Sequence, residues 1–446
     1  MITIEVGARV KLRNLPEDLE RKFILANNIE NPKFRMYERM GFWTGNTPKQ
    51  IELFQRESGA LVLPRGYFQT AIHEIKAASV SFKINDRTVC PVARVPNPGG
   101  QLFIFQAQAL EKLLKRRSGI LEAPPGSGKT NMLLSAIPRL KTNTLILVHT
   151  TELLNQTMER ARSWLGIEPG VIGGGKEDIQ PVTVAMVQTL AKKVLKDSDI
   201  ASFFGCILTD ECHHSPALMW ARILQQLPAR FKYGFSATCW RKDGLGFLMQ
   251  RLIGSKTATV SRKEVEAEGK IVRPDVEVVP TEYFYSLEDS SEWTKMITDL
   301  VRDPERNYLI KQEVSKRIAT DTQALILTDR IEHANLLSRM LQDLSPVLLT
   351  GELTKTDRAQ AMKKVRKGTQ LTIATTHLLG EGIDVPGWDL LFLVTPISGG
   401  PKTLQAAGRV TRPAPGKNKA VLVDFLDSRI PMLKAAFKKR QELYAA

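Results

Sequence analysis

The chain is organised around one glycine-rich stretch, Ala123-Pro-Pro-Gly-Ser-Gly-Lys-Thr130. The apolar run Ser118-Gly-Ile-Leu-Glu122 precedes it and the run 131–137 follows it, so the order strand, loop, helix is predicted. Gly126 and Gly128 allow successive backbone N–H groups to turn inward, and the positive end of the following helix lies beside them. This pattern predicts a cradle for phosphate groups at the end of a strand in an α/β fold.

Each residue of the loop has an expected role. Lys129 is expected to reach the β- and γ-phosphates of a nucleotide, and Thr130 to hold Mg²⁺. Ala123 stands where the usual pattern has its first glycine. Gln106, upstream of the loop, carries an amide that both donates and accepts, which predicts that it reads the N6/N7 edge of adenine. The loop residues expected to bind the nucleotide are Pro125, Gly126, Ser127, Gly128, Lys129 and Thr130.

Length and composition bound the class of protein. A chain of 446 residues suggests about three domains, each large enough for its own core. No apolar run approaches the ~20 residues that span a bilayer, and the first residues lack the pattern of a secretory signal, so the cytoplasm is the expected compartment. The four cysteines have no C-x-x-C spacing, which argues against a zinc site and fits reduced thiols.

The charge balance points to a polyanionic partner. Lys and Arg number 63 against 47 Asp and Glu, which gives a net charge of +16. Nucleic acid is the commonest partner of so basic a chain. A basic surface that only faces solvent is the alternative that composition alone leaves open.

Residues 1–98 are predicted to form a small α+β domain, an accessory module for DNA binding. Short strands are predicted at residues 2–6 and 60–63, and helices at 49–56 and 67–75. The module is followed by a linker, Pro96-Asn-Pro-Gly-Gly100.

Aromatic residues of this module lie among basic ones. They are Phe42, Trp43, Tyr67 and Phe68. Such a mixture suits stacking on bases with contact to phosphates, but for any one of these residues a place in the core is favoured.

Residues 99–262 are predicted to form a doubly wound parallel sheet. Apolar strands that each end in polar residues are expected at 144–149, 182–187, 206–210 and 233–238. Strands that alternate with helices place their site at the carboxyl ends of the strands.

An acidic pair ends one of these strands. Asp210 is expected to serve Mg²⁺, and Glu211 to orient and deprotonate the attacking water. His213 is expected to relay the state of the γ-phosphate to the segment that contains Ser236 and Thr238.

Residues 263–446 repeat the α/β pattern without a phosphate loop. Strands are expected at 323–328, 371–375, 390–395 and 419–424, with a helix at 331–344. This second domain is best explained as a partner that supplies cations to the nucleotide. Arg409 and Arg412 stand three apart on one helical face, so both can address one phosphate, and Asp384 is expected to touch the ribose or these arginines.

These segments together resemble the motor core of superfamily 2 helicases. The resemblance covers roughly residues 100–430 and rests on Gln106, the phosphate loop, Asp210-Glu-Cys-His213, Ser236-Ala-Thr238, Gly380-Glu-Gly-Ile-Asp-Val-Pro386 and Gln405-Ala-Ala-Gly-Arg-Val-Thr-Arg412. Within the superfamily it is most similar to the XPB-like group, which includes phage-encoded DNA helicases. The segment 237–244 also carries this likeness, although it reads Arg241-Lys-Asp where that group has Arg-Glu-Asp.

The resemblance implies two tandem RecA-like domains that use ATP and Mg²⁺ to move on DNA. It adds Gln405 to the catalytic residues and Gly382 to those that bind nucleotide. It also implies DNA contacts at Thr150, Thr151, Gln188, Thr189, Arg241, Thr328, Arg330, Thr375 and Thr376. Contacts of this kind position the nucleic acid without reading its sequence.

The expected function is an ATP-dependent DNA helicase or translocase. The expected DNA is single-stranded, forked or branched, and the expected setting is a monomer in the cytoplasm of a bacterium or a phage-infected host. Two alternatives remain open, an RNA-directed motor of the same superfamily and an ATP-driven motor subunit of a restriction or repair assembly.

Overall fold

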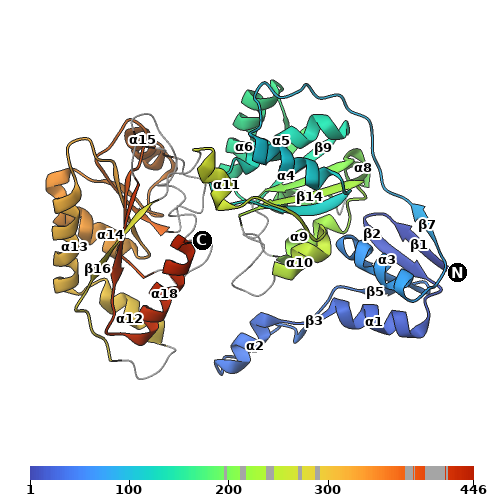
Figure 1. The fold of residues 1–446 in the computed structure, drawn as a ribbon, viewed down its shortest axis with the longest axis horizontal. Coiled ribbons are helices and arrows are strands. Elements are labelled where there is room, and N and C mark those ends of the chain that lie inside the picture. Colours follow the sequence, from blue (N-terminus) through green and yellow to red (C-terminus); the bar gives the residue numbers. More distant parts are fainter. Residues whose placement is uncertain are drawn as a thin grey trace. The chain divides into compact units, whose positions relative to one another are not determined.

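In the part of the chain that the structure describes, three sheets of five, eight and six strands carry the fold (Figure 1). The structure is a computed structural model, and its contacts divide the chain into two units. The first is Met1–Pro124 with Gly128–Ser261, and the second is Arg262–Ala446 with Pro125–Ser127. The described residues are 1–194, 198–210, 217–237, 246–269, 274–286, 292–376, 385, 387–396, 417 and 420–445.

The N-terminal module is built on the five-stranded sheet. Its strands, in spatial order, are β5 (Gln55–Glu57), β6 (Ala60–Pro64), β2 (Arg9–Arg13), β1 (Ile2–Val6) and β7 (Phe82–Asp86). Buried residues alternate along β1, so one face of the sheet packs on the helices α1 (Glu17–Asn27) and α3 (Phe68–Ala77). The strands predicted at 2–6 and 60–63 and the helix predicted at 67–75 are confirmed within two residues at each end.

The prediction of a helix at residues 49–56 is wrong. This stretch forms β4 (Gln50–Glu52), which pairs antiparallel with β3 (Asn28–Glu30), and then β5. Ile51 of β4 is buried against Leu248. A helix of eight residues is marginal by itself, so strand pairing and the burial of Ile51 decide the structure.

Residues 31–49, called the arm from here on, extend from the β3–β4 pair away from the five-stranded sheet (Figure 1). They contain the helix α2 (Pro32–Arg39). For each aromatic residue of the module, the favoured prediction was a position in the core. This prediction is confirmed for Tyr67, which is 3% exposed. It is wrong for Phe42 and Trp43, which are 57% and 89% exposed.

The eight-stranded sheet forms the first RecA-like domain. Its strands, in spatial order, are β11 (Lys176–Asp178), β10 (Gly170–Gly173), β12 (Val182–Met186), β9 (Thr144–Val148), β13 (Cys206–Asp210), β14 (Phe231–Ser236), β8 (Ser118–Glu122) and β15 (Lys256–Thr259). All are parallel except β11. The central strands are buried along their whole length, as parallel strands covered on both faces require.

Two helical layers cover this sheet. One consists of α4 (Ile104–Leu114), α5 (Lys129–Leu140) and α6 (Thr151–Leu165). The other consists of α7 (Val187–Val194), α8 (Ser198–Phe203), α9 (Ala217–Leu224) and α10 (Gly246–Leu252). The strands predicted in this domain are all present. The phosphate loop after β8, the polar residues after β9 and β12, and Asp210 at the end of β13 lie at one edge of the sheet.

Two buried cations join the N-terminal module to the first RecA-like domain. The Arg65 guanidinium donates to the carbonyl of Gly7 (2.7 Å) and to that of Arg230 (3.3 Å). The Lys232 ammonium nitrogen donates to the carbonyls of Ala8 (3.2 Å) and Leu224 (2.6 Å). Burial lowers the pKa of Arg65 to about 10 and that of Lys232 well below its ordinary value. The predicted boundary at residue 98 stays a prediction, because both parts belong to one compact unit.

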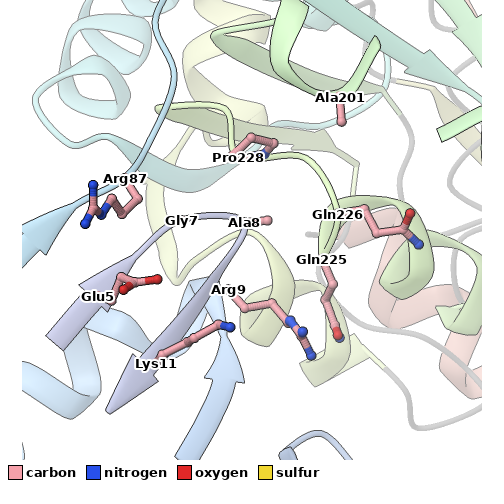
Figure 2. Close-up of a pocket in the computed structure, with 10 residues that line it drawn as sticks. All are labelled: Glu5, Gly7, Ala8, Arg9, Lys11, Arg87, Ala201, Gln225, Gln226 and Pro228. Atoms are coloured by element: carbon pink, nitrogen blue, oxygen red, sulfur yellow. The ribbon is translucent and has the colours of Figure 1, made fainter. Parts of the chain in front are cut away.

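A cavity of about 460 Å³ remains at this junction (Figure 2). Gly7, Ala8, Arg9 and neighbouring residues line it from the module, and Ala201 and the loop 225–228 line it from the RecA-like domain. This loop precedes β14, so the cavity lies at the amino edge of the sheet, opposite the edge where β8 ends in the phosphate loop.

The six-stranded sheet of the second unit forms the second RecA-like domain. Its parallel strands, in spatial order, are β16 (Asp275–Pro280), β21 (Val421–Leu426), β20 (Leu390–Leu393), β17 (Ala324–Thr328), β19 (Leu371–Thr375) and β18 (Val347–Leu349). Its helices are α11 (Arg262–Ala267), α12 (Trp293–Leu300), α13 (Pro304–Arg317), α14 (Ile331–Met340), α15 (Lys355–Arg366) and α18 (Pro431–Ala445). Apolar clusters pack on both faces of the sheet.

The predicted fold class is thereby confirmed, with two RecA-like sheet domains after a small α+β module. The predicted helix at 331–344 ends at Met340 and is followed by a 3-10 turn, Gln342–Leu344. Among the described residues, no helix combines the length and the apolar character needed to cross a membrane.

Candidate nucleotide-binding site

The phosphate loop connects β8 to α5 at the carboxyl edge of the first sheet. Gly126 has φ +83° and Gly128 has φ +76°, which lie in the left-handed region that favours glycine. Gly128 is the N-cap of α5, so the free N–H groups of the first helical turn point toward the loop. Ala123 is fully buried, and its N–H donates to the carbonyl of Ser236 at 2.9 Å. The alanine at the first position therefore fits the loop, and it ties the loop to the end of β14.

Lys129 is the first residue of α5, and its side chain turns back onto the loop. Its side chain is only 9% exposed, and its ammonium nitrogen donates to the carbonyls of Ala123 (3.2 Å) and Pro124 (3.4 Å). The cation is thus held at the loop by short-range contacts that a phosphate oxygen can replace.

The two residues predicted to serve Mg²⁺ meet in the structure. The Thr130 hydroxyl lies 3.5 Å from a carboxylate oxygen of Asp210. Thr130 is on the first turn of α5, and Asp210 ends β13 with 5% exposure. A hydroxyl and a carboxylate are oxygen ligands of the kind that Mg²⁺ prefers, so these residues fit the ion.

Gln106 is buried next to the loop. Its amide oxygen accepts from the N–H of Phe103 at 3.0 Å, which satisfies a free donor at the start of α4. A Cβ atom placed on Gly128 would lie 2.4 Å from its amide nitrogen. This capping role was not predicted, although a Gln at the third position of a helix is its usual signal. The reading of adenine by Gln106 stays a prediction.

Predicted nucleic-acid contacts follow two of the strands, at the starts of α6 and α7. Gln188, after β12, donates from its amide to the carbonyl of His149, after β9, at 2.9 Å. The Thr150 hydroxyl accepts from the N–H of Leu153 at 3.2 Å and caps α6. The start of α7 is therefore held to the segment after β9, and the exposed Thr151 and half-buried Thr189 lie on the first turns of α6 and α7.

In the second RecA-like domain, the predicted contacts lie at the ends of β17 and β19. Thr328 is fully buried, Thr375 and Thr376 are 5% exposed, and Arg330 is half-buried. The Thr376 hydroxyl donates to the carboxylate of Asp329. Thr328 therefore supports the loop from inside, and the side chain of Arg330 is the more accessible of the two.

A buried hydrogen-bond network that sequence reasoning missed surrounds Thr328. Its hydroxyl lies 2.9 Å from Nδ1 of His333 and 2.8 Å from the hydroxyl of Thr395, and Nε2 of His333 lies 2.9 Å from the amide oxygen of Asn307. Burial and the nearby charge of Arg306 lower the pKa of His333 to about 3. Thr328 therefore joins the ends of β17 and β20, and a neutral His333 links Thr328 to Asn307 of α13.

The remaining predicted site residues lie outside the described residues. They are Glu211, His213, Thr238, Arg241, Gly382, Asp384, Gln405, Arg409 and Arg412.

Comparison with known proteins agrees with this architecture. A family model described as "Type III restriction enzyme, res subunit" matches residues 100–241, and one described as "Helicase conserved C-terminal domain" matches residues 305–414. The chain is 28% identical to the probable helicase D10 of Escherichia phage T5 over 322 residues, which cover 69% of this chain and 67% of that protein. It is 27% identical to the DNA 3'-5' translocase XPB2 of Sulfurisphaera tokodaii over 354 residues, which cover 70% of this chain and 79% of that protein.

A solved structure of Dbp5 from S. cerevisiae, bound to RNA and ADP BeF3, has a TM-score of 0.54 at 16% identity. The match covers 84% of this chain and 90% of that one and shows the shared fold. The chain belongs to the superfamily 2 helicases, with XPB-like and phage-encoded helicases among its relatives. It is an ATP-hydrolysing helicase that acts on nucleic acid.

Proposed function

We propose that this helicase couples ATP hydrolysis to movement on DNA and thereby separates strands or drives branch migration at forks or junctions. The observation that carries the ATPase part is the 3.5 Å approach of Thr130 to Asp210 beside the phosphate loop. The DNA part is supported by the name of the relative from Sulfurisphaera tokodaii, a DNA 3'-5' translocase, and by the net charge of +16.

In this proposal the first RecA-like domain holds the nucleotide. The loop N–H groups and Lys129 bind its phosphates, Thr130 and Asp210 hold Mg²⁺, and Gln106 faces the adenine. When bound, Mg²⁺ neutralises charge that develops on the phosphates. Glu211 orients and deprotonates the attacking water.

The second RecA-like domain supplies Arg409 and Arg412 as cations for the γ-phosphate, with Gln405 in the same stretch. Gly382 and Asp384 are proposed to lie against the nucleotide. His213, Ser236 and Thr238 are proposed to pass the state of the γ-phosphate to the DNA contacts. These contacts are the threonines, Gln188, Arg241 and Arg330 named above.

A strand-displacement assay tests the proposal. The full chain, ATP and Mg²⁺ are mixed with forked DNA that carries one labelled strand, and release of that strand is expected. Lys129→Ala and Glu211→Gln should both abolish turnover, and Glu211→Gln should still bind ATP. DNA-stimulated ATPase without release would reduce the function to translocation, and retained hydrolysis by either variant would contradict the assigned roles.

The same preparation distinguishes the alternatives. ATPase stimulation is compared between DNA and RNA of equal sequence, and stronger stimulation by DNA is expected. Preference for RNA would replace the proposal with an RNA-directed motor. Activity that appears only with added partner subunits would favour a motor subunit of a restriction or repair assembly. We further propose that the protein works as a monomer in the cytoplasm of a bacterium or a phage-infected host.

A further inference from the structure

The arm, residues 31–49, has surface features that the fold itself does not require. All eight residues of α2 are described, and none of them is buried. Met36, Met40, Phe42 and Trp43 are 46%, 54%, 57% and 89% exposed. Apolar side chains left in water on a helix and its following turn are typical of a surface that binds something.

One face of α2 combines apolar and cationic groups. Lys33, Met36, Tyr37 and Met40 are spaced three and four apart, so they share that face. The Lys33 ammonium lies 5.4 Å from the centre of the Tyr37 ring. The chain then returns over this face, since the ring of Phe42 meets that of Tyr37 edge-on at 6.4 Å.

The charge of the arm is positive. It carries the exposed cations Lys33, Arg35, Arg39 and Lys49 and one carboxylate, that of Glu38. Arg35 also pairs with Glu30 at the base of the arm at 2.8 Å. Aromatic rings among cations suit a single-stranded nucleic acid, because every base offers a face for stacking and every phosphate carries a negative charge.

The base of the arm is held firmly to the first RecA-like domain. The N–H of Asn31 donates to the carbonyl of Lys49 at 2.9 Å, and its amide donates to that of Pro48 at 2.9 Å. Below it, Ile51 and Leu53 pack on Leu248 of α10. The arm is therefore fixed to the domain that is proposed to bind ATP. A nucleic-acid strand held by this domain can then reach the arm.

We propose that the arm is a stacking platform for unpaired bases, with Trp43 and Phe42 against the base faces and Lys33, Arg35 and Arg39 near phosphates. This proposal rests on the proposed function, since it assumes that the motor exposes single strands. It gives the N-terminal module a defined partner, which is single-stranded nucleic acid.

Binding of labelled oligo(dT) to the full chain, measured by fluorescence anisotropy, tests this. Trp43→Ala should bind at least about fivefold more weakly than the wild type, because one lost stack has about that effect. Trp43→Phe should stay within about twofold. Phe284→Ala is the matched control, since Phe284 is 65% exposed in the second unit and its loss should leave affinity unchanged.

The salt dependence of oligo(dT) binding is a second measurement, and it tests the cations of the arm. Replacing Lys33 and Arg39 together by Ala should reduce the slope of log affinity against log salt by about 1.4, the value for two phosphates on a single strand. Quenching of tryptophan fluorescence by oligo(dT) should also shrink in Trp43→Ala.

The outcomes separate this inference from the proposed function. Wild-type affinity and quenching in Trp43→Ala, with normal binding by the wild type, would overturn the platform alone. A wild type that neither binds oligo(dT) nor gains ATPase activity with DNA would overturn the proposed function. A change of oligomeric state in Trp43→Ala, with unchanged affinity for oligo(dT), would identify the arm as a protein interface and also overturn the platform.

Discussion

Thr130 and Asp210 are 80 positions apart in the chain and 3.5 Å apart in space. The contact forms because the first turn of α5 and the end of β13 meet at the carboxyl edge of one sheet. These two side chains would hold Mg²⁺ through oxygen atoms, the ligands that this ion prefers.

We expect Thr130→Ala to lower ATP hydrolysis by about two orders of magnitude, since it removes one ligand of the ion that stabilises the transition state. Thr130→Ser keeps the hydroxyl and should retain most of the activity. Steady-state ATPase assays over a Mg²⁺ titration measure both variants. Equal rates for Thr130→Ala and the wild type at all Mg²⁺ concentrations would contradict this role of Thr130.

His333 predicts a pH dependence of stability. Its pKa is lowered to about 3 in the folded chain, against an ordinary value of 6.5. Below pH 6.5 the unfolded state binds a proton that the folded state does not, so the free energy of unfolding falls as pH falls from about 6.5 toward 3. Between pH 7.5 and pH 5.5 this amounts to about 1.4 kcal/mol.

Urea denaturation at these two pH values measures the effect, with His333→Gln as the comparison. The variant should be less stable at neutral pH, because its amide does not reproduce both hydrogen bonds of the ring. Its stability should nevertheless depend less on pH, by about 1.4 kcal/mol over this interval. An unchanged pH dependence would show that His333 is not neutral in the folded state.

At the scale of elements, α13 is joined to the end of β21 by a buried ion pair. The Arg306 guanidinium donates to the two carboxylate oxygens of Asp427 at 2.7 and 3.1 Å, and also to the carbonyl of Val394 at 2.8 Å. Both side chains are at most 1% exposed. The ion pair therefore fixes the position of α13 against the end of β21.

Arg306→Met should destabilise the second RecA-like domain by about 3–5 kcal/mol, because it leaves the Asp427 carboxylate buried without its cation. The double variant Arg306→Met with Asp427→Leu should recover a large part of this loss, since no charge then stays buried. Chemical denaturation of the wild type, both single variants and the double variant measures the coupling. Additive losses would show that the two groups do not interact.

At the scale of the whole molecule, the N-terminal module is docked on the first RecA-like domain at close range. A Cβ atom on Gly66 would lie 2.4 Å from the carbonyl oxygen of Gln250 and 2.5 Å from that of Arg251. The Arg251 guanidinium also lies 4.5 Å from the centre of the Tyr67 ring. The glycine permits this approach of two backbones, so the docking depends on it.

Gly66→Ala should lower the stability of the first unit by about 1–3 kcal/mol, because backbone atoms must move to admit the methyl group. Gly99→Ala is the control, since a Cβ atom on Gly99 would have open space for 4 Å around it. Thermal unfolding measures the difference, and limited proteolysis between residues 87 and 103 should be faster in Gly66→Ala alone. Equal melting temperatures for Gly66→Ala and Gly99→Ala would mean that the contact between the module and the RecA-like domain accommodates the added methyl group.

The sequence by itself determined the central strands of both sheet domains and the phosphate loop, but not the outer strands β10, β11, β15, β16 and β18. Cys206–Asp210 and Ala324–Thr328 were predictable because a parallel strand covered on both faces needs apolar side chains along its length. Gly126 and Gly128 were predictable because positive φ favours glycine. These signals are local, so they can be read without knowing what packs against them.

Only the tertiary structure decided which polar and aromatic residues are covered. Trp43 and Tyr67 have similar chemistry, yet one is 89% exposed and the other 3%. Thr328 was predicted to contact DNA, and its side chain is fully buried and hydrogen-bonded to His333. The buried guanidinium of Arg65 donates to the carbonyl of Arg230, which is 165 positions away in the chain. Burial depends on which distant segment packs over a residue, and the local sequence pattern does not identify that segment.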